Sequence, residues 1–170
     1  MGSLAAGEGA MTVNPLPELL PGDCPLYWRS DLVDWIIRLK TWTKTAHVEI
    51  YRGGGFSYAS RSGTGVNAYP LRLDGLIMIR RPDPRFGKLN SAAAAGWFAG
   101  VQGQGYDWVC LFSFYLARSI GSKSRQICSE FSTRAYRAYG FDAIAHDYDA
   151  DLVAPAQFVQ SPAFETIWRA

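Results

Sequence analysis

The chain has 170 residues, of which 48% are hydrophobic, so it is long enough for one domain with a substantial core. Its formal net charge of +2, without a Lys/Arg block, gives no reason to expect nucleic acid as a partner, and no apolar run reaches membrane-spanning length. Three cysteines are too few, and an odd number, for a disulfide framework, which favours a reducing compartment.

The start of the chain does not resemble a signal peptide. Residues 1–10 are small and polar and lack a basic start followed by an apolar centre. We expect them to be a disordered leader or tag, and residues 11–170 to form a single domain. The protein is then expected to be cytoplasmic as synthesised. Its export as an effector or a phage product would need a mechanism other than a signal peptide.

The first half of the chain predicts mainly strands. A short strand is expected at 24–28, and apolar residues at helical spacing predict an amphipathic helix over 31–42. Further strands are predicted, with glycine-containing turns between them, at 47–51, 56–60, 66–71 and 76–79.

The second half changes to helical periodicity. Helices are predicted from Asn90 or Ser91 to about 102, from about 106 to 120, and from 128 to about 139, before an irregular end with one short helix. Strands followed by helices are typical of an α+β fold. We expect an antiparallel sheet of about five strands packed against the helix that begins at Cys128.

Cys128 is the main candidate for a reactive group. It lies in the first turn of its predicted helix, where unpaired N–H groups and the helix dipole favour a thiolate over a thiol. The alternative is a buried cysteine that packs as a small hydrophobe.

Cys24, on a strand, and Cys110, inside an apolar helix, lack a helix N-terminus and are expected to be structural. No zinc-ligand spacing is present, so neither a metal nor a cofactor is expected.

A nucleophilic cysteine needs a nearby base, and the chain has only two histidines. His146 lies in a polar loop and is expected to be solvated. His47 opens a predicted strand, where a rigid element can aim it at the cysteine. His47 is therefore the predicted base.

The length of the glycine-rich loop after His47 predicts which residues lie beside His47 in the hairpin. A loop of two or four residues pairs His47 with Ser60 and puts Glu49 and Tyr58 on the same face, because strand side chains alternate. A loop of three residues pairs His47 with Arg61 instead. Ser60 is the predicted residue that accepts the imidazole N–H and orients the ring, and Glu49 is the competing candidate.

Three segments together resemble a known family. Gly22-Asp23 precedes a strand, the segment 45–50 (Thr-Ala-His-Val-Glu-Ile) opens a strand, and the segment 127–131 (Ile-Cys-Ser-Glu-Phe) opens a helix, in that order. This pattern is similar to the circularly permuted branch of the NlpC/P60 papain-like superfamily, the YiiX/YaeF-type amidases, over about residues 20–160. The resemblance implies a papain-like fold, with Cys128 as nucleophile and His47 as base.

The resemblance also implies a third polar residue on the strand after the histidine. Many relatives have a glutamate in that region, whereas this chain has Ala59-Ser60. Glu130 matches the Cys-Ser-Glu pattern, complements the helix dipole in the first turn, and is a candidate for holding a loop or a substrate amine. With Glu49 and Tyr58, it completes the predicted set of substrate-binding or orienting residues.

The predicted function is a cysteine peptidase or amidase that cleaves an amide bond through an acyl-enzyme. Its expected partner is a small peptide, such as a peptidoglycan stem peptide, or an acyl-amide. Two alternatives remain open: a lipid-directed acyl hydrolase or transferase, and a catalytically silent binding module. The sequence predicts no oligomeric state.

Overall fold

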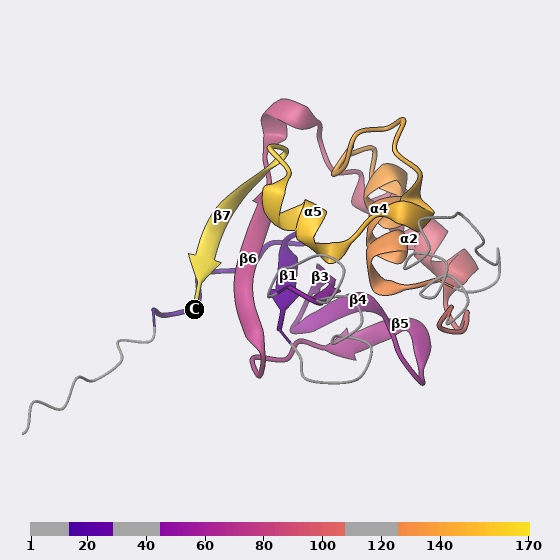
Figure 1. Cartoon of the computed structure of the whole chain (residues 1–170), viewed down its shortest axis with the longest axis horizontal. Coiled ribbons are helices and arrows are strands. Elements are labelled where there is room, and N and C mark those ends of the chain that lie inside the picture. Colours follow the sequence, from indigo (N-terminus) through magenta and orange to yellow (C-terminus); the bar gives the residue numbers. More distant parts are fainter. Residues whose placement is uncertain (1–13, 29–44, 108–125) are drawn as a thin grey trace, which may run out of the picture.

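The computed structural model describes residues 14–28, 45–107 and 126–170, and the chain has an α+β fold (Figure 1). The leader at 1–10 and the helices predicted over 31–42 and 106–120 lie wholly or almost wholly outside the described residues. In the described part, every strand pairing is antiparallel. No helix in this part is long and apolar enough to cross a membrane.

The strands form two sheets rather than one sheet of about five strands. The first sheet has the order β2-β1-β6-β7, and the second has the order β3-β4-β5. The strands of the first sheet are β1 (Cys24–Tyr27), β2 (His47–Val48), β6 (Leu76–Pro82) and β7 (Phe164–Arg169). Those of the second are β3 (Ile50–Gly53), β4 (Phe56–Arg61) and β5 (Gly65–Pro70).

The strand predicted at 47–51 belongs to both sheets. Its first part is β2, in which His47 pairs with Tyr27 of β1, and its second part is β3, which pairs with β4. Glu49 lies between the two parts, and its N–H donates to the Pro25 carbonyl at 3.0 Å. The segment therefore passes from one sheet to the other at Glu49.

The end of the chain is more regular than predicted. Phe164–Arg169 forms β7, which pairs with β6 from Pro82↔Phe164 to Met78↔Arg169. Figure 1 shows β7 as the outermost strand, with the C-terminus at its end. The pattern of residues 164–169 is short and follows Pro162, so the local sequence is ambiguous. The free edge of β6 supplies the hydrogen-bonding partner that makes it a strand.

Three of the predicted helices are confirmed. The helix α2 (Ser91–Val101) begins after Asn90, whose side-chain oxygen accepts the Ala93 N–H at 3.0 Å, as expected for an N-cap. The helix α4 (Cys128–Ala138) begins at the predicted cysteine. The short helix predicted near the end of the chain is α5 (Pro155–Gln160), and the 3-10 helices η1 (Pro84–Phe86) and η2 (Ala150–Leu152) complete the description.

The core lies between α4, α2 and the strands. The apolar stripe predicted for α4 is buried, with exposed fractions of 0% for Phe131 and 4% for Ala135. The Phe131 ring lies against Trp97 and Phe98 of α2, with centroids 5.6 and 6.4 Å apart. This packing fixes the start of α4, and hence Cys128, against the sheets.

Candidate functional site

Cys128 is the first residue of α4 and lies beside the entry to β2. Its sulfur is 4.0 Å from the carbonyl oxygen of Ala46, and its side chain is only 1% exposed. The residue before it, Ile127, has extended backbone geometry and ends the preceding loop. The cysteine thus lies at a helix N-terminus, as predicted, and next to the segment that carries His47.

His47 is held between a carboxylate and the cysteine. Its Nε2 lies 3.1 Å from Glu49 Oε1, and because a carboxylate oxygen only accepts, Nε2–H donates. The other ring nitrogen, Nδ1, is then the atom available to Cys128. Burial lowers the pKa of His47, but attraction to the Cys128 sulfur and to Glu49 outweighs burial and raises the pKa to about 9.

Glu49 is a fully buried carboxylate that two cations stabilise. Its Oε1 accepts from Arg61 Nε at 2.9 Å and from Arg61 Nη2 at 2.7 Å, in addition to His47. Burial by itself would raise the pKa of Glu49. The hydrogen bond and charge of His47, together with the charge of Arg61, hold that pKa below its usual range, so Glu49 remains ionised.

Ser60 does not lie opposite His47, because the observed pairing follows the alternative register, in which position 47 corresponds to Arg61 rather than to Ser60. A β-bulge between Tyr51 and Gly53 shifts the pairing by one residue, and Ile50 then pairs with Tyr58. Since a shift of one residue exchanges the faces of a strand, Ser60 turns away from the imidazole. Its hydroxyl donates to the Gln126 carbonyl at 2.5 Å, in the loop before α4.

The same shift removes Tyr58 from the predicted orienting group. Tyr58 is 8% exposed and packs on Phe98 of α2, with ring centroids 3.8 Å apart. It belongs to the hydrophobic core, and it shares its face of β4 with Ser60 rather than with Arg61.

Glu130 has a capping position rather than one facing an open cleft. It is 0% exposed, its Oε2 accepts the Ile127 N–H at 3.3 Å, and its Oε1 lies 2.9 Å from Arg134 Nη2. Arg134 also bonds Asp151 at 2.8 Å. Burial raises the pKa of Glu130 to about 7, against the opposing effect of Arg134. Glu130 therefore supports the backbone just before Cys128.

Among the described residues, the other cysteine, Cys24, is a buried core residue, and the other histidine, His146, is an exposed surface residue. Cys24 is fully buried, and burial raises the pKa of its thiol to about 12. His146 is exposed, as predicted, and its Nδ1 lies 3.1 Å from Asp142 Oδ1. Cys110 lies outside the described residues.

Arg61 is the residue near His47 that sequence reasoning undervalued. The sequence predicts it only as the partner of His47 in the register of a three-residue loop, whereas in the structure it contacts Glu49 through two N–H groups. The signal that could have found it is a strand arginine near the expected position of a glutamate, since a buried carboxylate needs a cationic partner.

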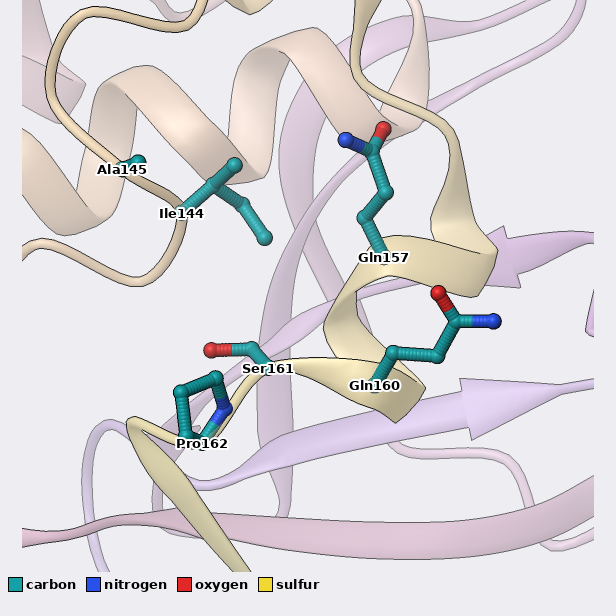
Figure 2. A pocket seen from close by; sticks show the side chains of 6 residues that line it. All are labelled: Ile144, Ala145, Gln157, Gln160, Ser161 and Pro162. Atoms are coloured by element: carbon teal, nitrogen blue, oxygen red, sulfur yellow. The ribbon is translucent and has the colours of Figure 1, made fainter.

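A shallow hollow of about 200 Å³ lies elsewhere, beside α5. Figure 2 shows Gln157 and Gln160 of α5 on one side and Ile144 and Ala145 on the other, with Ser161 and Pro162 at the base. The Ser161 hydroxyl is already used, since it donates to the Ala143 carbonyl at 2.6 Å. None of the residues around Cys128 lines this hollow.

Comparisons with known proteins identify a shared fold. No family model matches the chain, and no curated protein matches its sequence significantly. The crystal structure of the metalloprotein YiiX from Escherichia coli O157:H7 superposes with a TM-score of 0.65 at 18% sequence identity, covering 88% of this chain and 97% of that one. This chain therefore has a fold similar to that of YiiX over most of its length.

Proposed function

We propose that the protein is a cysteine hydrolase of the circularly permuted papain-like type, which cleaves an amide bond with Cys128 as nucleophile and His47 as base. The observation that carries this proposal is the position of His47, which lies between a fully buried, ionised Glu49 and the cysteine at the start of α4. A nucleophile, a base and a group that orients the base are the elements of a catalytic triad.

The order of the parts along the chain supports the permuted type. The strand that bears His47 precedes the helix that bears Cys128, and the fold similarity to YiiX covers 88% of the chain. In ordinary papain-like enzymes, the cysteine helix comes first. Glu49 takes the orienting role that the sequence left open between Ser60 and Glu49.

The proposed reaction has two stages. The Cys128 thiolate attacks the substrate carbonyl carbon, forming a C–S bond while the oxyanion is met by N–H groups at the helix N-terminus. The C–N bond then breaks, and the His47 imidazolium gives its proton to the leaving amine. In the second stage, water attacks the thioester, His47 takes a proton from the water, and the carboxylic acid departs from the regenerated thiolate.

A metal centre does not fit these residues, although YiiX is called a metalloprotein. The Nε2 of His47 is committed to Glu49, and the same carboxylate oxygen also accepts from Arg61. Within residues 14–28, 45–107 and 126–170, no three His, Cys, Asp or Glu side chains lie close enough together to hold a metal ion. No step of the proposed reaction uses a metal.

The first test is the rate of alkylation by iodoacetamide at each cysteine, measured by peptide mass spectrometry from pH 4 to pH 10. At pH 7 we expect Cys128 to react at least about a hundredfold faster in wild type than in His47→Ala, since a base next to a thiol contributes about 10²–10⁴. Cys24 is the internal control because it is as buried as Cys128, while burial raises the pKa of its thiol to about 12. Equal rates in the two proteins would remove the catalytic interpretation and favour a binding module.

The second test identifies the bond cleaved. Short D-amino-acid-containing stem peptides, set against fluorogenic acyl esters, separate an amidase from a lipid-directed acyl hydrolase. Cys128 is 1% exposed, so a substrate reaches it only after the covering residues move. We therefore expect higher turnover with extended peptides, whose binding energy can drive such a movement, than with a minimal anilide.

A further inference from the structure

Among the described residues, hydrogen bonds reach the Glu49 carboxylate at one oxygen only. Three N–H groups converge on Oε1: His47 Nε2 at 3.1 Å, Arg61 Nε at 2.9 Å and Arg61 Nη2 at 2.7 Å. The other oxygen, Oε2, is buried and accepts no hydrogen bond from the described residues. Arg61 is thus the main group that determines how the carboxylate is turned relative to His47.

Arg61 is itself held in place from behind. Its guanidinium carbon lies 4.1 Å from the ring centroid of Tyr69 on β5, a cation–π contact. The Tyr69 hydroxyl lies 2.8 Å from both Thr64 Oγ1 and the Gly65 carbonyl, so the ring is anchored at its far end. The Arg61 side chain is only 12% exposed. The guanidinium therefore meets Glu49 in one orientation.

We propose that Arg61 is the positioning residue of this site, which pins the Glu49 carboxylate so that Oε1 meets His47 Nε2 and the imidazole presents Nδ1 to Cys128. This inference rests on the proposed function for its catalytic meaning, although the geometry that it describes does not depend on turnover. A lysine cannot replace Arg61 fully, because an ammonium lacks the planar set of N–H groups that holds both Glu49 and the Tyr69 ring.

In the part of the chain that the structure describes, the titratable groups that face Glu49 come from three strands. They are His47 of β2, Arg61 of β4 and Tyr27 of β1. Burial, followed by the charge of Glu49, raises the pKa of Tyr27, which therefore remains a neutral phenol. Without Arg61, His47 is the one cation among the described residues that still hydrogen-bonds Glu49, and the carboxylate gains a proton at a higher pH than in wild type.

The test is histidine NMR, which suits a chain with only two histidines. Wild type, Arg61→Met and Arg61→Lys are compared with Arg52→Met, a matched control in which the arginine also lies over a tyrosine ring, at 5.7 Å from Tyr58. We expect the His47 Nε2–H proton to exchange with water at least about tenfold faster in Arg61→Met, to an intermediate degree in Arg61→Lys, and as in wild type in the control.

A second readout is the acid titration of Glu49, seen through the His47 signals. Its midpoint should rise by about one pH unit or more in Arg61→Met, because a cation within hydrogen-bond reach is lost, and less in Arg61→Lys. In a Glu49→Gln background, Arg61→Met should change neither the exchange rate nor the His47 pKa further. The His146 signals and the far-UV spectrum report whether each variant is folded.

Two results overturn the inference. One is a folded Arg61→Met protein whose His47 exchange and acid midpoint equal those of wild type, and the other is an additive effect in the Glu49→Gln background. If Arg61→Met cannot be obtained folded, Arg61→Lys decides alone, since unchanged exchange and midpoint there also overturn the inference. Failure of the proposed function is distinguishable, because it leaves Cys128 unreactive while the His47 readouts still respond to Arg61.

Discussion

Cys24 and Cys128 lie in the same hydrophobic core and are almost equally buried, at 0% and 1% exposed. Cys24 is on strand β1 beside Tyr136, and burial raises the pKa of its thiol to about 12. Cys128 opens a helix and has His47 as its neighbour. The comparison teaches that burial does not separate an inert thiol from a candidate nucleophile, whereas the charged or neutral character of the neighbouring group does.

The two buried glutamates, Glu49 and Glu130, show that burial alone does not determine the pKa of a carboxylate either. Glu49 and Glu130 are both 0% exposed. Two cations, His47 and Arg61, hold the pKa of Glu49 below its usual range, whereas burial raises the pKa of Glu130 to about 7 in spite of Arg134. Glu49 is thus suited to orienting an imidazolium, and Glu130 to a cap that changes its charge near neutral pH.

The largest expected effect concerns the two cysteines. On any substrate that wild type turns over, Cys128→Ser should lower kcat by about 10⁴-fold or more, because the nucleophile is lost. Cys24→Ser should stay within about twofold of wild type, since its sulfur is in the core and has no role in the reaction. Steady-state kinetics with circular dichroism checks both variants. Equal losses of kcat in the two folded variants would contradict the distinction drawn between Cys128 and Cys24.

The next largest effect is the pH dependence of the free energy of unfolding, which should distinguish Glu130 from Glu49. The pKa of Glu130 is about 7 in the folded state and near 4.5 when unfolded, so the folded state binds more protons between these values. Stability contributed by Glu130 is therefore full below about pH 4.5 and is lost as pH rises through about 7, by about 3 kcal/mol.

Glu130→Gln keeps the shape of the cap and should remove that dependence on pH. Urea unfolding from pH 4.5 to pH 7.5 measures it, with exposed Glu165→Gln on β7 as the matched control. Wild-type and Glu130→Gln curves that stay parallel across this range would show that the charge of Glu130 is not linked to folding.

A smaller effect is expected at Glu49. Glu49→Gln keeps a hydrogen-bond acceptor but removes the charge that favours imidazolium, so the pKa of His47 should fall from about 9 by about one unit. NMR titration of the two histidines measures this shift, with His146 as the reference. Glu130→Gln serves as the comparison, and an identical fall in both variants would contradict the assignment of Glu49 as the orienting group.

The smallest effect is expected at Ser60. Ser60→Ala should lower the free energy of unfolding by about 1 kcal/mol, since the Gln126 carbonyl loses its donor. The pH dependence of Cys128 alkylation should not change. A shifted alkylation profile in a folded Ser60→Ala protein would restore the role that the sequence predicted for this residue.

Features with a local cause were predictable. The helix α4 follows from apolar spacing within eleven residues, and the N-cap of α2 follows from one asparagine. Cys128 at a helix start and His47 at a strand start are likewise local features, and the scarcity of histidine made their pairing a natural expectation. The strand at 164–169 was missed because only the edge of β6 makes it regular.

The amino-acid sequence by itself determined the α+β composition, the start of α4 and the candidate pair Cys128 and His47, because each depends on residues a few positions apart. Only the tertiary structure decided which polar side chain meets the imidazole. The bulge between Tyr51 and Gly53 shifts the strand register by one residue, and side chains alternate along a strand. That single shift turns Ser60 towards the helices and brings Arg61 to Glu49.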